Sequence, residues 1–172
     1  MRRKLTVLVA LGAALSVFAV AAQATGMRTV TTQGEEIFVP NGVIEATMHF
    51  DPGNINVRTG ATIQWVHEDS TRDPHTISVV NRSDLPNSVK QVFNCGGPGT
   101  VCRKFLKQHF PPNSPPVRRI DVGANGLDQV GDSLLLLPNH PISAVVSAPE
   151  GTVLYYLCAI HAWMQGTITV TD

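Results

Sequence analysis

A cysteine, a histidine and a methionine at three-residue spacing near the C-terminus carry the strongest chemical signal in the sequence. They are Cys158, His161 and Met164, in the pattern C-x2-H-x2-M. Far upstream, His75 follows Pro74 at the start of an alternating run. One thiolate, two imidazoles and one thioether are the donors of a mononuclear copper site, in which a trigonal plane of Cys and two His carries a weak axial Met. These four residues therefore predict one copper ion that cycles between Cu(I) and Cu(II), and hence electron transfer.

The choice of His75 as the fourth ligand has competitors, because the sequence contains six histidines. His75 is preferred because a turn precedes it and an alternating run follows it, which predicts a strand that begins at the same pole as the Cys158 loop. The remaining histidines are predicted to lie at the surface: His49, His67, His109 and His140. Of these, His140 is the first alternative as a ligand.

The three cysteines predict one disulfide and one free thiol. Cys95 and Cys102 bracket a short loop rich in glycine, and two nearby cysteines in an oxidising compartment usually pair. Cys158 is then left as the free thiol with metal-ligand neighbours. Two alternatives remain open, namely that all three cysteines are redox-active or that Cys158 forms an intermolecular bridge.

Short alternating runs separated by turn signals predict an all-β sandwich. The runs include 62–65, 77–79, 142–145, 152–157 and 166–170. The stretch 81–138 differs, since it is rich in Pro, Gly and charged residues, and its prolines at 111–116 cannot sit inside a sheet. We expect a long loop excursion there before the C-terminal strands, stapled by the disulfide and carrying a short helix near 104–109.

The N-terminus has the layout of a signal peptide over residues 1–24, which leaves a single domain of residues 25–172 with the insertion at about 81–138. An uncleaved anchor is the alternative, and the pair Arg2-Arg3 leaves the export route open. Cleavage changes the formal net charge from zero to about −3, which is too mild to indicate a nucleic-acid partner. We expect a periplasmic or secreted monomer without stable membrane insertion.

The ligand residues and their flanking strands resemble the cupredoxin family of type 1 blue copper proteins, of the plastocyanin and amicyanin kind. The similarity covers about 46–80 and 140–170, including the run from Phe50 to Trp65 and the strand from Pro149 to Cys158. It implies a Greek-key β-sandwich with copper at one end. Many members carry Asn directly after the first His, whereas this chain has Thr76, whose hydroxyl can still link the two ligand loops.

The resemblance also implies that electrons leave through the edge of His161, beside Ala162 and Trp163. Both neighbours are candidate docking residues for transient redox protein partners, and Trp163 has the alternative role of a buried cap over the copper. Multicopper enzymes relay electrons through histidines that flank the Cys, but here the flanking residues are Leu157 and Ala159. We therefore expect a small soluble electron carrier rather than an enzyme, with copper sequestration or delivery as the alternative.

Overall fold

The computed structural model describes residues 26–172. The predicted signal peptide at 1–24 thus lies outside the described residues. Within 26–172, no helix is long and apolar enough to cross a membrane.

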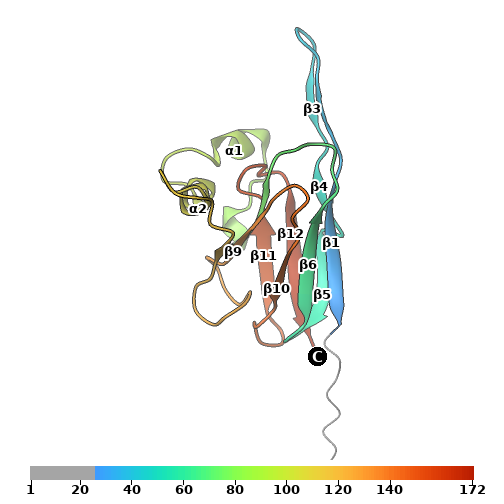
Figure 1. Ribbon diagram of the computed structural model, residues 1–172, viewed down its shortest axis with the longest axis vertical. Coiled ribbons are helices and arrows are strands. Elements are labelled where there is room, and N and C mark those ends of the chain that lie inside the picture. The colour runs from blue at the N-terminus through green and yellow to red at the C-terminus, as the bar shows by residue number, and fades with distance from the viewer. Residues whose placement is uncertain (1–25) are drawn as a thin grey trace, which may run out of the picture.

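Two β-sheets pack face to face, which confirms the predicted all-β sandwich (Figure 1). The first sheet has the order β10-β6-β1-β4. Its strands are β1 (Met27–Gln33), β4 (His49–Asp51), β6 (Thr62–His67) and β10 (Ile142–Val145). The second sheet has the order β5-β12-β11-β7-β9-β8. Its strands are β5 (Asn54–Arg58), β7 (His75–Val80), β8 (Arg119–Ile120), β9 (Ser133–Leu136), β11 (Val153–Leu157) and β12 (Gln165–Thr171).

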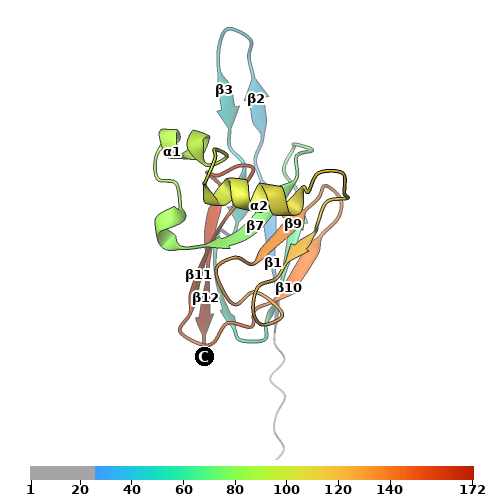
Figure 2. The same ribbon diagram turned by 90° about the vertical axis from the view of Figure 1, so that its left-hand side faces the viewer.

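The core lies between the sheets and is filled by the side chains that point inward from the strands. In β5 and β12 every second residue is buried, as expected for strands with one covered face. Both β7 and β9 are instead buried along their whole length, because helix α2 (Val101–His109) crosses the outer face of their sheet (Figure 2). Phe105 on α2 packs there with Val80 and Leu157 in a second apolar cluster.

The segment 81–138 leaves the sandwich and then returns to it. It begins with a 3-10 helix (Arg82–Asp84), α1 (Val89–Asn94) and α2, and the Cys95–Cys102 disulfide joins the end of α1 to the start of α2. The segment then returns to the second sheet as β8 and β9. Strand β9 was missed because both of its faces are covered, so it does not alternate.

A two-stranded hairpin formed by β2 (Glu36–Phe38) and β3 (Ile44–Ala46) projects from the sandwich (Figures 1 and 2). It extends beyond the end at which β11 finishes and β7 begins. We call this end the ligand pole, because it carries His75 and the loop of residues 158–164.

Candidate metal centre

Three of the predicted ligands lie on the tight connection between β11 and β12. Leu157 pairs with Gln165, so residues 158–164 form the whole loop. The Cys158 N–H donates to the Met164 carbonyl at 2.9 Å, and the Met164 N–H donates to the His161 carbonyl at 2.8 Å. These bonds fix the loop internally, and they place the thiol and the imidazole on the same side of it.

The remaining predicted ligand, His75, is the first residue of β7, which pairs with β11. The Cys158 Sγ atom lies 3.8 Å from Nδ1 of His75 and 3.8 Å from Nδ1 of His161. The two Nδ1 atoms are 3.2 Å apart. A triangle with these sides has a centre about 2.1 Å from each corner, close to the usual lengths of metal bonds to imidazole and thiolate. The three side chains are thus already arranged to hold a single transition-metal ion.

Met164 is buried in the main core cluster, which also contains Cys158. Its side chain is 1% exposed, so it does not contact solvent. A thioether next to a trigonal Cys and two His donors is the expected weak axial ligand of a copper site. That role for Met164 remains a proposal.

The outer nitrogen of His75 is held by a buried carboxylate that the sequence did not reveal. His75 Nε2 donates to Asp69 Oδ2 at 2.9 Å, and the side chains of both residues are fully buried. The other oxygen of Asp69 accepts from the N–H and the hydroxyl of Thr71, at 3.1 and 2.6 Å. Because Nε2 carries the proton, the Nδ1 lone pair is free to bind a metal. Asp69 therefore fixes both the tautomer and the orientation of the ligand.

Burial sets the protonation of this site. It lowers the pKa of His75 to about 4, although Asp69 opposes the change. It also lowers the pKa of His161, against the effect of Asp73, whose Oδ2 lies 3.7 Å from His161 Nε2. Burial raises the pKa of the Cys158 thiol, and backbone N–H groups of Thr76 and His161, each 3.3 Å from Sγ, oppose it. Neutral imidazoles are ready ligands, and a bound cation stabilises the thiolate.

The pKa of the Asp69 carboxyl group is set by its hydrogen bonds and neighbouring charges more than by burial. Burial alone would raise its pKa, but hydrogen bonds from Thr32 and Thr71 and the charges of His75 and His67 lower it below the ordinary value. Asp69 is thus ionised at neutral pH, and it places a negative charge beside the metal centre.

Thr76 links the two ligand loops, as the sequence suggested. Its hydroxyl accepts from the Ala159 N–H at 2.7 Å. The same hydroxyl lies 2.9 Å from that of Ser78, which lies 2.7 Å from that of Ser133. His109 Nε2 is 2.7 Å from the Ser133 hydroxyl. A buried chain of polar groups therefore runs from the Cys158 loop to the end of α2.

Two histidines predicted to lie at the surface are buried instead. His109 is 0% exposed, because its Nδ1 donates to the Val117 carbonyl at 2.6 Å and its other nitrogen meets Ser133. The side chain of His67 is only 5% exposed, and its Nε2 donates to the Asp73 carbonyl at 2.9 Å. His49 and His140 are exposed, as predicted. His140 is not among the grouped metal-binding side chains of the described part of the chain.

The structure separates the two candidate docking residues. Ala162 is 3% exposed and packs in the second apolar cluster, so its side chain offers almost nothing to a partner. Trp163 is 39% exposed, and its ring centroid lies 5.2 Å from that of His161. Its indole N–H donates to the Met48 carbonyl at 3.1 Å. Trp163 therefore borders the ligand at the surface and does not cover it as a buried cap.

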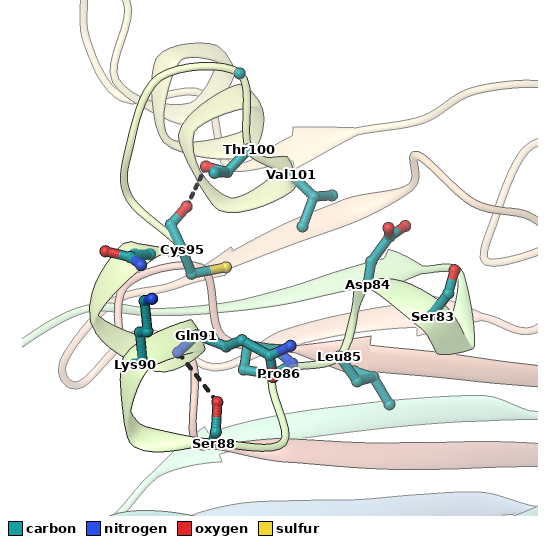
Figure 3. Close-up of a pocket in the computed structure, with 12 residues that line it drawn as sticks. Ser83, Asp84, Leu85, Pro86, Ser88, Lys90, Gln91, Cys95, Thr100 and Val101 are labelled. Carbon is teal, nitrogen blue, oxygen red and sulfur yellow. Dashed lines mark hydrogen bonds between the residues drawn. The ribbon is translucent and has the colours of Figure 1, made fainter.

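A cavity of about 610 Å³ lies beside Cys95 (Figure 3). Its lining comes from the 3-10 helix, α1 and the start of α2, and includes Leu85, Lys90 and Val101. Two of its hydroxyls already have partners, since Ser88 accepts from the Gln91 N–H and Thr100 donates to the Cys95 carbonyl. The candidate metal ligands do not line this cavity.

No protein-family model and no curated protein matches the chain. Among solved structures, auracyanin B is similar with a TM-score of 0.49 and 15% identity, over 89% of this chain and 94% of that one. A purple cupredoxin from Nitrosopumilus maritimus gives 0.41 and 18%, over 84% and 99%. Plastocyanin from Dryopteris crassirhizoma gives 0.38 and 23%, over 83% and 98%. These solved structures are cupredoxins, the family that the sequence resembles.

Proposed function

We propose that this protein is a type 1 blue copper protein, with His75, Cys158, His161 and axial Met164 as ligands, that carries electrons between redox partners outside the cytoplasm. The observation that carries the proposal is the triangle of one sulfur and two nitrogen atoms around a point about 2.1 Å from each. A soft thiolate with two imidazoles and a thioether selects copper and suits both of its oxidation states. When bound, copper supplies the one-electron couple and the thiolate charge transfer that gives the blue colour.

Rapid electron transfer requires ligands that move little between oxidation states, and the chain holds each of them. Hydrogen bonds within the loop fix Cys158 and Met164, Asp69 fixes His75, and Thr76 ties the two loops together. His161 is 7% exposed, so one imidazole edge reaches the surface. The geometry supports a centre that keeps its shape and exchanges electrons through that edge.

An electron carrier is favoured over an enzyme because the described part of the chain holds no second, separate group of metal-binding side chains. Within residues 26–172, the other group of His, Cys or carboxylate side chains that could hold a metal is His67, Asp69 and His75. It shares His75 with the first, and Asp69 is already bonded to that ring. The residues on either side of Cys158 are Leu157 and Ala159, which cannot relay electrons to further metals as histidines would.

The visible spectrum of the copper-loaded mature domain tests the assignment. We expect an intense blue absorption that Cys158→Ser abolishes, while the double variant Cys95→Ser/Cys102→Ser keeps it because neither disulfide cysteine is among the metal-binding side chains. A small inorganic oxidant should remove one electron from the reduced protein rapidly without releasing copper. A colourless copper complex would contradict the site, and prompt loss of copper to a chelator would favour delivery over electron transfer.

A further inference from the structure

The β2–β3 hairpin, residues 36–46, exposes several large apolar side chains to solvent. We call it the hairpin arm. Phe38 is 69% exposed and Ile44 is 67% exposed, and Val43 at the turn is 51% exposed. In the described residues the arm pairs with no other strand, so these side chains have no neighbouring sheet to cover them. Clustered exposed apolar residues of this kind mark interaction surfaces.

The strand register divides the arm into two different faces. Phe38 pairs with Ile44, and Glu36 pairs with Ala46. Because alternate residues of a strand share a face, these four side chains lie together on one face of the arm. Ile37, which pairs with Glu45, lies on the opposite face. The face with Phe38 and Ile44 thus carries the two most exposed apolar side chains of the arm, with a carboxylate at its base.

The base of the arm is fastened to both sides of the metal centre. The Ser70 N–H, in the loop before His75, donates to the Gly34 carbonyl at 3.0 Å. On the other side, the Trp163 indole N–H donates to the Met48 carbonyl, and the Trp163 ring lies tilted against that of His161. The arm therefore rises beyond the ligand pole, from the end of the sandwich that carries His161 (Figures 1 and 2).

The charged side chains of the arm itself are all acidic. Residues 34–46 include three glutamates, and no Lys or Arg occurs between Arg28 and Arg58. Asp73, whose side chain is 55% exposed, adds a further carboxylate beside His161. An anionic membrane surface or the same acidic face of a second copy would be repelled, whereas a protein with basic residues around an apolar patch is attracted.

We propose that the Phe38/Ile44 face of the hairpin arm, together with Trp163, is the docking surface for a redox protein that carries basic side chains around an apolar patch at its own cofactor. The inference rests on the proposed electron-carrier function and names the chemistry of its partner. The arm would hold the partner over His161, the ligand edge nearest the surface. Trp163 and the arm would then both contact the same partner.

Rapid-mixing kinetics test the arm, with the reduced copper protein as donor and an oxidised basic c-type cytochrome as acceptor. Ile44→Ser and Phe38→Ser should each lower the second-order rate constant about fivefold or more, the effect of losing a central interface residue. Ile37→Ser is the matched control, because it removes the same side chain from the opposite face of the same hairpin. It should change the rate less than twofold. The wild-type rate should also fall as ionic strength rises.

Ferricyanide, a small acceptor that needs no docking arm, separates this proposal from the proposed function. Every arm variant should reduce ferricyanide at the wild-type rate. A wild-type protein that cannot reduce ferricyanide would overturn electron transfer itself. Equal cytochrome rates for Ile44→Ser and Ile37→Ser, or no reaction of the wild type with the cytochrome while ferricyanide reacts, would overturn the arm. So would dimerisation abolished by Ile44→Ser, or binding to anionic vesicles.

Discussion

Replacing Asp69 by Asn tests whether the buried carboxylate tunes the metal centre. The amide oxygen can still accept the proton on His75 Nε2, so the tautomer and ring position are kept. The negative charge is lost, however, and it stabilises the more positive oxidised copper more than the reduced one. We therefore expect Asp69→Asn to bind copper, to stay blue and to have a higher reduction potential.

The size of the shift follows from the geometry. The carboxylate oxygen is 2.9 Å from Nε2, and the path continues across the ring to the centre of the donor triangle, about 7 Å in all. One unit charge at that distance contributes about 2 kcal/mol at an effective dielectric constant near 20. For a single electron this energy corresponds to about 100 mV.

Cyclic voltammetry of the copper-loaded variants measures the shift directly. Glu68→Gln is the control, because it removes an adjacent carboxylate that is exposed and hydrogen-bonded to Gln33. Solvent screens that charge, so the control should shift the potential by no more than about a quarter as much. A change below about 20 mV in Asp69→Asn, or an equal change in both variants, would show that Asp69 holds His75 without tuning it electrostatically.

Three further outcomes are expected. Met164→Leu should keep copper and colour but raise the potential, since a donor to the oxidised ion is lost, and loss of copper would refute a weak axial role. Alkylation of the unreduced, metal-free, denatured chain followed by intact-mass analysis should label Cys158 alone, because Cys95 and Cys102 are joined; labelling of all three would contradict this. Burial lowers the pKa of His109, so its contribution to stability is present above the unfolded value near 6.5 and is lost as the pH falls below it. His109→Gln should therefore reduce the slope of unfolding free energy against pH, by up to about 1.4 kcal/mol per pH unit just below about pH 6.5, and an unchanged slope would refute this role of His109.

The four proposed ligands could be singled out from sequence because three of them occupy one loop and the fourth opens a run with clear alternation. Asp69 could not, since a carboxylate six residues before a histidine has no distinctive spacing. Its position depends on the turn that Thr71 closes onto it. The burial of His109 was missed for a related reason. Its partners Val117 and Ser133 come from segments whose approach only the folded chain shows.

The β-sandwich could also be predicted from sequence, through alternation, but strand β9 and the hairpin arm could not. Strand β9 is covered on both faces, so its residues carry no period of two. The hairpin arm has strands of three residues, too short for any periodicity, and its apolar residues face solvent rather than a core. Local pattern therefore located most strands with one buried face, together with β7, whose sequence alternates, and it missed β9 and the hairpin arm.

The seven-residue loop between β11 and β12 also determines what a metal ion has to contribute to folding. Because Leu157 pairs with Gln165 and Ser78, the sheet itself brings the two ligand segments together. The interactions of the sheet therefore already offset the loss of chain entropy on assembling them. Small zinc domains differ, since they remain unfolded until the ion gathers their ligands. Here the ion meets a preorganised cage, and it should stabilise the fold by mass action alone, about 1.4 kcal/mol for each tenfold excess of free metal over the dissociation constant.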